Sequence, residues 1–367
     1  MKSTAAILLS RQPLRPCAQT GWVKKVVDAV AWIKENNLQL LTSVGMQTWE
    51  LQIAAALREK LSFTCIVPAP DREMFEKKSI YVQQQFDLFR KPVRIVPLVP
   101  EGIGQEIQSL PALRDRALVA EADILVPVSI RTRGGMEQLL HRSAESGKPV
   151  IDRFRIEYEK RTGPVHYHVQ GSHVSESIVQ CDIPYSIHWT RSSNTAWPTE
   201  RKLDYYNDIL DSERYPRSAF FSLRNILEYK LICATSKHMQ DKIPTVSFSD
   251  IPPVEIIPLM RWRARYRMMS FEPYGIGIKK EHALKLGIKP VIYYSRKNVP
   301  SVEKENHYLL QSRGEITDWR QEREYRFKGD FGLHAISKKY LACFCYTASE
   351  ARAIEKDFGV QAYGFID

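Results

Sequence analysis

Two short glycine-containing turns in the first half of the chain carry residue types that bind phosphate groups. The first turn reads Ser43-Val44-Gly45-Met46-Gln47-Thr48, and the second reads Arg131-Thr132-Arg133-Gly134-Gly135. Each follows an apolar run and precedes a run with helical periodicity, so N–H groups at a helix start would be open to an anion. The guanidinium groups of Arg131 and Arg133 would add charge-assisted hydrogen bonds. The turns together predict that a nucleotide, or a small molecule derived from one, is bound by Gly45, Met46, Gln47, Thr48, Arg131, Thr132, Arg133, Gly134, Gly135 and Glu137.

Glycine in a strand-to-helix turn is also common for purely geometric reasons, which is the alternative for both turns. Glu137, two residues after the second glycine of the pair, likewise has two interpretations. It would act as an acid on the bound ligand, or its carboxylate would complement the positive end of the helix, as glutamates in a first helical turn commonly do.

A second group of charged residues lies late in the chain, in the segment from Asp318 to Phe327. If this segment is a strand, alternation places Glu322, Glu324 and Arg326 on one face. Two carboxylates beside an arginine would hold a sugar hydroxyl, a water or a cation. The alternative is a structural ladder of salt bridges between strands.

Four arginines alternate with other residues in the segment Arg261-Trp262-Arg263-Ala264-Arg265-Tyr266-Arg267. On a strand, Arg261, Arg263, Arg265 and Arg267 would share one face, which predicts a contact surface for phosphate or nucleic acid. The alternative is a solvated sheet edge whose other face buries the aromatic side chains.

Histidines and cysteines do not predict a metal site. His166, His168 and His173 lie close together in the sequence, but no carboxylate or cysteine with metal-ligand spacing accompanies them. The six cysteines show neither a disulfide framework nor paired zinc-ligand spacing, so we expect reduced thiols in a cytoplasmic protein.

Length and composition point to two domains without a membrane span. A chain of 367 residues exceeds what one core usually supports, and 44% of its residues are hydrophobic. No run approaches the roughly 18 consecutive apolar residues that a transmembrane helix needs. The net charge of +11 is spread over both halves of the chain, which favours an anionic ligand or a diffuse basic face over a polybasic tail.

The elements that must position the two turns alternate regularly. Apolar strand-like runs at 5–10, 38–44, 63–67, 93–98 and 123–130 are separated by segments with helical periodicity. This pattern predicts an α/β fold, with a doubly wound parallel sheet of the Rossmann-like type over residues 1–155. Residues 156–200 lack long periodicity and are expected to form a linker or functional loop. Residues 201–367 mix helices and strands and predict a separate α+β domain.

The first 150 residues or so resemble the Rossmann-like superfamily of the "lonely guy" phosphoribohydrolases, the lysine-decarboxylase-like proteins and DNA-processing protein A. The resemblance rests on Ser43-Val44-Gly45, on Arg131-Thr132-Arg133-Gly134-Gly135, and on Gly147-Lys148-Pro149-Val150. The phosphoribohydrolases have Pro-Gly-Gly-x-Gly-Thr before a helical glutamate, whereas this chain has Arg133-Gly134-Gly135-Met136-Glu137. The resemblance therefore implies phosphate binding. Hydrolysis of the base–ribose bond, a nucleotide N-glycosidase activity, stays an open alternative because the Gly-Thr of that motif is absent here.

The C-terminal part resembles uncharacterised domains of antiphage and abortive-infection loci, and more remotely the DarT-like ADP-ribosyltransferases. The DarT-like enzymes have an early His-x-Thr, a helix beginning with Asn-Leu or Asn-Ile, and a late catalytic glutamate. Here His188-Trp189-Thr190, Asn225-Ile226, and Glu322 or Glu324 occur in that order. The resemblance implies His188, Glu322 and Glu324 as catalytic residues, with His188 positioning the NAD ribose and a glutamate stabilising positive charge on it.

Two functions follow. In the first, a defence-related enzyme binds a nucleotide through its N-terminal sheet, and its C-terminal domain acts on NAD or nucleic acid by ADP-ribosyl transfer or NAD consumption. In the second, the chain is a non-catalytic, basic DNA- or RNA-binding protein related to DNA-processing protein A. NAD is the candidate cofactor, and a second copy of the chain is a further candidate partner; a membrane is not expected.

Overall fold

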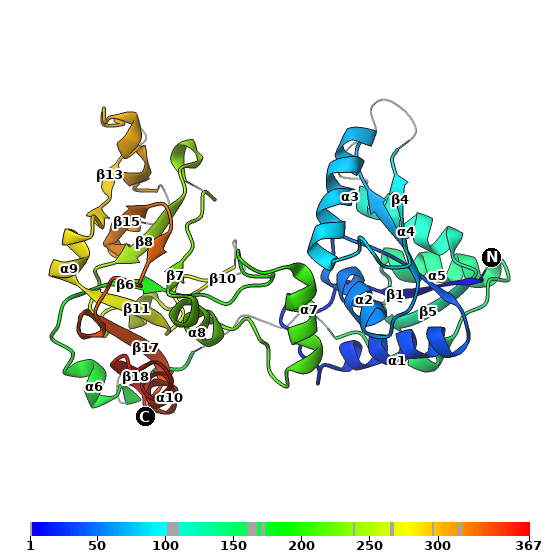
Figure 1. Ribbon diagram of the computed structural model, residues 1–367, viewed down its shortest axis with the longest axis horizontal. Coiled ribbons are helices and arrows are strands. Elements are labelled where there is room, and N and C mark those ends of the chain that lie inside the picture. The colour runs from blue at the N-terminus through cyan, green and yellow to red at the C-terminus, as the bar shows by residue number, and fades with distance from the viewer. Residues whose placement is uncertain are drawn as a thin grey trace. The chain divides into compact units, whose positions relative to one another are not determined.

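The computed structural model describes residues 2–100, 110–159, 167–169, 173–237, 239–264, 268–295, 297–314 and 318–367. The chain divides into two compact units (Figure 1). The first unit comprises Met1–Gly163 and Asn194–Pro216, and the second comprises Pro164–Ser193 and Arg217–Asp367. Neither unit is continuous in sequence, which differs from the expected division into residues 1–155, a linker over 156–200, and 201–367.

The first unit is a five-stranded, wholly parallel sheet with alternating helices, as the sequence predicts. Its strands in spatial order are β4 (Val93–Leu98), β3 (Phe63–Pro68), β2 (Gln39–Ser43), β1 (Thr4–Leu9) and β5 (Ile124–Ser129). Its helices are α1 (Gly21–Glu35), α2 (Gln47–Arg58), α3 (Arg72–Phe86), α4 (Leu110–Glu121), α5 (Gly135–Glu145) and α7 (Lys202–Asp211), with the 3₁₀ turn η2 at Asp152–Phe154.

Strand β1 is buried on both faces, because it lies inside the sheet and helices cover both sides. Ala5, Ile7 and Leu9 belong to one hydrophobic cluster, and Ala6 and Leu8 belong to a second cluster on the other face. The strand order reverses at this strand: β2, β3 and β4 follow on one side of β1, and β5 lies on the other. In sheets of this kind, ligands bind beyond the carboxyl ends of the strands at the point of reversal.

After α5 the chain runs beside β5. Parallel bridges pair Val150 with Leu125 and Ile156 with Ser129, one on each side of the 3₁₀ turn η2, and residues 155–158 form the extended segment after this turn. The N–H of Ile156 donates to the carbonyl of Val128 at 2.8 Å. This pairing places residues 155–158 next to the turn that follows β5.

Helix α7 belongs to the first unit rather than to the second domain that the sequence predicts. Its bounds agree with the predicted helix, but its buried Tyr205, Tyr206 and Ile209 join the hydrophobic cluster of β1 and α1. Figure 1 shows α7 next to α2, which lies about 150 residues earlier in the chain. Residues 194–216 therefore complete the first core.

The second unit contains a seven-stranded, mostly antiparallel sheet with helices, in agreement with the predicted α+β class. Its strands in spatial order are β12 (Lys289–Pro290), β15 (Glu324–Lys328), β8 (Thr245–Ser249), β6 (Tyr185–Trp189), β11 (Gly275–Lys279), β17 (Leu341–Thr347) and β18 (Ala362–Ile366). Only the last pair, β17 with β18, is parallel. Strand β6 lies mid-sheet, within the stretch 156–200 that was expected to be a linker.

Smaller elements complete the second unit. Its helices are α6 (Glu176–Val179), α8 (Ala219–Tyr229), α9 (Lys280–Lys285) and α10 (Ala348–Phe358). In the described part of this unit, two-stranded sheets pair β9 (Trp262–Arg263) with β10 (Met268–Met269), β13 (Ile292–Tyr294) with β14 (Leu310–Ser312), and β7 (Leu231–Ile232) with β16 (Phe331–Gly332). The 3₁₀ turns are η4 (Gln240–Lys242), η5 (Ile257–Leu259), η6 (Lys304–Leu309), η7 (Trp319–Glu322) and η8 (Lys338–Tyr340). Among the helices that the structure describes, none has the length and apolar character needed to cross a membrane.

Candidate functional site

The turn between β5 and α5 lies where the strand order reverses. The N–H of Arg131 donates to the hydroxyl of Ser10 at 2.9 Å, and Ser10 follows β1 directly. The side chain of Gln12 bonds to both the carbonyl and the hydroxyl of Ser129. The ends of β1 and β5 are therefore joined by side chains at this point, and the turn after β5 starts from a fixed position.

Backbone geometry explains the glycine at position 134. The N–H of Gly134 donates to the carbonyl of Arg131 at 3.1 Å, and a Cβ at position 134 would lie only 2.9 Å from that same oxygen. Arg133 adopts the left-handed conformation, with φ of 59°. Arg131, Thr132, Arg133 and Gly135 are nevertheless exposed, so this tight turn is open to solvent.

Glu137 stabilises the turn from within. Its carboxylate accepts the N–H of Arg133 at 2.5 Å, which supports the interpretation that it complements the helix start. The N–H groups of Gly135 and Met136 have no acceptor in the described part of the chain. Two amides at the start of α5 are thus available to a ligand, while the amide of Arg133 already has a carboxylate partner.

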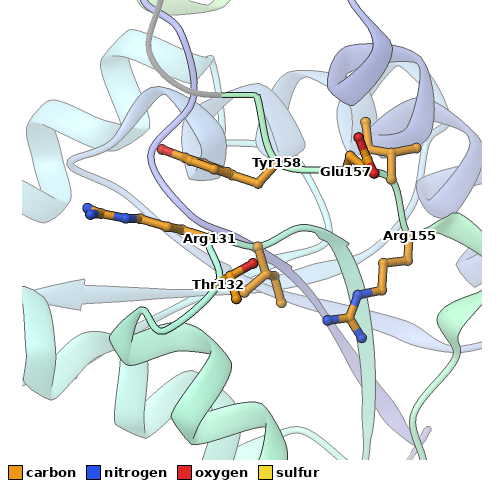
Figure 2. Close-up of a pocket in the computed structure, with 7 residues that line it drawn as sticks. Arg131, Thr132, Arg155, Glu157 and Tyr158 are labelled. Atoms are coloured by element: carbon orange, nitrogen blue, oxygen red, sulfur yellow. The ribbon is translucent and has the colours of Figure 1, made fainter.

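A cavity of about 930 Å³ lies beside this turn. Its described lining residues are Ile130, Arg131, Thr132, Arg155, Ile156, Glu157 and Tyr158. In Figure 2, Arg131 and Thr132 come from the turn, and Glu157 and Tyr158 come from the extended segment on the opposite wall. Ligand cavities typically have volumes of roughly 300–1,000 Å³, so this one is large enough for a nucleotide.

Two cationic side chains line the cavity. Arg155 pairs with Asp152 at 3.4 Å on the exposed side of η2. Arg131 has no ion pair with any residue that the structure describes. The hydroxyl of Tyr158 donates to the carbonyl of Arg11 at 2.9 Å, which ties the extended segment to the loop after β1. The lining offers a net positive charge to a ligand.

The start of α1 approaches the same wall. A Cβ on Gly21, the first residue of α1, would lie 3.6 Å from the side chain of Ile156. Thr20 makes no side-chain cap to α1, and the first turn of α1 has no acidic residue. The positive end of α1 is therefore not neutralised locally, and it adds to the favourable potential for an anion.

The other predicted turn, Ser43–Thr48, is not part of this cavity. Its Gly45 N–H donates to the carboxylate of Glu50 at 3.1 Å. Glu50 is 5% exposed and also accepts bonds from Lys202 at 2.7 Å and from the Tyr206 hydroxyl at 2.8 Å, both on α7.

The side chains of the Ser43–Thr48 turn are engaged as well. Gln47 donates to the Tyr205 hydroxyl at 3.1 Å, and Met46 receives a contact from Arg114. Thr48 is buried, and its hydroxyl has no hydrogen-bond partner among the described residues. The structure does not bring the two turns into one cavity: strand β1 separates β2 from β5, and Glu50 and Tyr205 already bind the Gly45 amide and the Gln47 side chain.

Sequence reasoning missed one wall of the cavity, residues 155–158, and the two residues after β1, Ser10 and Gln12, that hold the end of β5 beside it. Polar residues directly after a strand were the available signal, as in Ser10-Arg11-Gln12 and in Arg155-Ile156-Glu157-Tyr158. Using that signal requires knowing the strand order, because only the reversal at β1 brings these two segments together.

The three residues expected to be catalytic in the second unit do not share one face of the sheet. Ser249 pairs with Ile187 of β6 and with Glu324 of β15, and paired residues point to the same face. His188 follows Ile187 and therefore points to the opposite face, where its ring contacts Phe248 with centroids 5.9 Å apart. The register therefore places His188 and Glu324 on opposite faces of the sheet and does not bring their side chains together.

Glu324 is partly buried and forms an ion pair with the buried Arg326. Its carboxylate accepts bonds from Arg326 at 2.9 and 3.0 Å and from the hydroxyl of Ser247 at 2.7 Å. Arg326 is 3% exposed and also donates to the carbonyls of Tyr308 and Leu310. This ion pair supports the alternative stated for Glu324 in the sequence analysis, a structural salt bridge rather than a ligand site.

Glu322 lies on η7 rather than on a strand, because Arg323 adopts a left-handed conformation just before β15 begins. Its carboxylate accepts a bond from Arg263 at 2.6 Å, and the Arg263 guanidinium lies over the Trp319 ring. Burial raises the pKa of the Glu322 carboxyl above its usual value, and Arg263 opposes that shift. The structure therefore joins two residues that the sequence assigned to separate sites.

The expected arginine surface is only partly described. Arg261 is exposed, while Arg263 turns toward Glu322 and Ser270. Arg265 and Arg267 lie outside the described residues. For the whole described chain, no group of three or more histidine, cysteine or acidic residues is arranged to hold a metal ion.

Comparisons with known proteins find only distant structural likenesses. No protein-family model matches the chain, and no curated protein sequence matches it. DNA processing protein A from Streptococcus pneumoniae is similar over 41% of this chain and 49% of its own, with 20% identity and a TM-score of 0.30. The single-stranded-DNA-binding DNA processing protein A from Helicobacter pylori is similar over 41% and 64%, with 13% identity and a TM-score of 0.30.

A third similar structure is the Moco carrier protein from Chlamydomonas rheinhardtii, over 42% of this chain and 78% of its own. Its identity is 14% and its TM-score is 0.26. This chain spans about half of the first of these proteins and about two thirds of the second.

Proposed function

We propose that the first unit binds a phosphorylated small molecule, a nucleotide or a nucleotide derivative, in the cavity beside the turn after β5. The observation that carries the proposal is a roughly 930 Å³ cavity at the point of strand reversal, lined by Arg131 and Arg155. The free amides of Gly135 and Met136 and the uncapped start of α1 support it. Backbone amides and guanidinium groups together suit phosphate better than any neutral ligand.

Calorimetric titration of the full chain with AMP and with inorganic phosphate tests this proposal. We expect both probes to bind, and we expect Arg131→Ala and Arg155→Ala each to weaken AMP binding about tenfold or more. A hydrogen bond to a charged group is worth roughly 1.5–3 kcal/mol, which corresponds to that factor.

Arg142→Ala is the matched control, because Arg142 is an exposed arginine on α5 that does not line the cavity. Absence of AMP binding to the natural sequence, or equal binding by Arg131→Ala, would overturn the proposal. A titration with a single-stranded oligonucleotide at two salt concentrations tests the nucleic-acid alternative. Tight, salt-sensitive binding of the oligonucleotide without binding of AMP would favour that alternative instead.

For the second unit we propose NAD as the substrate to test, with Glu322 as the catalytic carboxylate of an ADP-ribosyl transfer. One observation favours Glu322 over the other two expected residues. Its carboxylate is partly buried, has a raised pKa and lies outside the interior of the sheet. Both glutamates have a cationic partner, but the partner of Glu324 is the buried Arg326, whereas the partner of Glu322, Arg263, is itself partly exposed. His188 lies on the other face of the sheet.

An NAD-consumption assay compares Glu322→Gln with Glu281→Gln, which removes a carboxylate from the first turn of α9. We expect loss of turnover only in Glu322→Gln. Full turnover by Glu322→Gln, or no turnover by the natural sequence, contradicts this role.

A further inference from the structure

One acidic residue lies in the otherwise cationic cavity of the first unit. Glu157 lines the cavity together with Arg131 and Arg155, and its side chain is exposed to it. The structure records no hydrogen bond or ion pair for the Glu157 carboxylate with any described residue. Its neighbours on the same segment do have partners, because Arg155 pairs with Asp152 and Tyr158 donates to the Arg11 carbonyl.

A carboxylate without a partner opposes the binding of a bare anion. Like charges in one cavity repel each other, and the repulsion is larger at the reduced dielectric constant of a partly enclosed site than in bulk water. An ionised carboxylate can only accept hydrogen bonds, so it becomes favourable when the ligand brings hydroxyl or amino donors. The lining therefore suits a ligand with two features: an anionic group for the arginines, and donors close to it for Glu157.

The positions of the two cavity walls indicate which way the anionic group and the hydrogen-bond donors of the ligand would face. Figure 2 shows Arg131 and Thr132 on the turn that starts α5, with Glu157 and Tyr158 on the opposite wall. A phosphate bound at the turn and at the start of α5 leaves the group attached to it facing the wall with Glu157. In a nucleotide, that group is the sugar, whose hydroxyls are hydrogen-bond donors.

We infer that Glu157 is a specificity-determining residue that selects phosphorylated ligands whose sugar has free vicinal hydroxyls. This inference rests on the proposed function, since it names the class of ligand for the same cavity. Its carboxylate accepts hydrogen bonds from the ribose hydroxyls, and it disfavours inorganic phosphate and nucleotides that lack those hydroxyls. Ribonucleotides are thus the favoured ligand class.

The test is a calorimetric comparison of three probes: AMP, 2′,3′-dideoxyadenosine monophosphate, and inorganic phosphate. For the natural sequence we expect AMP to bind at least about tenfold more tightly than the dideoxy compound, because a charged hydrogen bond is lost with the hydroxyls. In Glu157→Gln we expect this ratio to fall toward one. We also expect phosphate to bind Glu157→Gln several-fold more tightly, because the repelling charge is gone.

Glu159→Gln is the matched control, because Glu159 lies two residues further along the same segment and does not line the cavity. It should leave all three affinities unchanged. A variant that merely disturbed the fold would weaken every probe, whereas our inference requires opposite changes for phosphate and for the AMP preference. Unchanged melting temperatures of both variants confirm that the fold is intact.

The outcomes separate the inference from the proposed function. If the natural sequence binds AMP and the dideoxy compound equally, or if Glu157→Gln keeps the preference, the inference is overturned while phosphate binding in the cavity stands. If the natural sequence binds neither AMP nor phosphate, the proposed function is overturned and the inference with it.

Discussion

At the scale of single residues, His188 shows how the fold changes an ionisation that the sequence cannot assign. Its Nδ1 lies 2.9 Å from the carbonyl oxygen of Ser247, and its ring packs against Phe248 inside the second unit. Burial lowers the pKa of His188 to about 4. Of the two smaller effects, the hydrogen bond with the Ser247 carbonyl raises this pKa, and the nearby positive charge of Arg191 lowers it further. A neutral imidazole is therefore part of the folded structure at neutral pH.

We predict that His188 makes the protein less stable as the pH falls from about 6.5 to about 4. Above pH 6.5 the imidazole is neutral in both the folded and the unfolded chain, so it adds no pH dependence. Between these values the unfolded chain takes up a proton that the folded chain does not, and the free energy of unfolding falls. Below about pH 4 both forms are protonated and the loss levels off. The total loss is at most about 3 kcal/mol, at roughly 1.4 kcal/mol per pKa unit.

Urea unfolding between pH 4 and 7 measures this effect as the difference between the natural sequence and His188→Gln. Glutamine cannot be protonated but still offers a donor for the Ser247 carbonyl. We expect the two stabilities to converge as the pH falls below 6.5, because only the natural sequence carries the histidine contribution. His334→Gln is the control, at a histidine whose side chain is exposed. Parallel curves for the natural sequence and His188→Gln would contradict the prediction.

At the scale of elements, the sequence predicts what depends on local periodicity. The apolar runs of the first 150 residues become β1 to β5 with boundaries shifted by few residues, and the predicted helix over 202–211 is α7. Such segments carry their signal within ten to fifteen residues, because one face of a helix or both faces of a buried strand must be apolar.

Local periodicity does not predict elements that are stabilised by partners far away in the sequence. Strand β6 is five residues long in a stretch rich in His, Ser and Thr, and its main partner β11 lies about 90 residues later. The predicted strand at Glu322 is instead a 3₁₀ turn, because a left-handed Arg323 interrupts the alternation there. The second half of the cavity depends on strand order, which no local pattern encodes. The sequence could therefore nominate the turn at Arg131 but not the wall at Glu157.

At the scale of the whole molecule, each unit has its own hydrophobic interior. Two clusters cover the two faces of the parallel sheet, and two others cover the two faces of the mixed sheet. The chain passes between the units three times, because residues 194–216 return to the first one. A cut after residue 155 would therefore leave the first unit without α7 and expose Glu50, whose carboxylate needs Lys202 and Tyr206.

Separate interiors predict two separable unfolding transitions in calorimetry of the full chain, each sensitive to changes in one unit. Tyr206→Phe removes a hydroxyl bonded to the buried Glu50 carboxylate and should cost the first unit about 1–3 kcal/mol. Glu324→Ala leaves Arg326 buried without its anionic partner and should cost the second unit about 3–5 kcal/mol. For units of this size, each kcal/mol lowers the melting temperature by about 2–4 °C. We therefore expect each variant to shift one transition and leave the other in place.

The double variant and a surface control complete this experiment. Tyr206→Phe combined with Glu324→Ala should show both shifts at their single-variant sizes, because the two sites share no partners and independent effects add. Tyr229→Phe removes a hydroxyl from an exposed side chain on α8 and should shift neither transition. A single transition moved equally by both variants would mean that the two interiors unfold as one cooperative body. The discontinuous chain path would then couple them, since the chain passes between the two units three times.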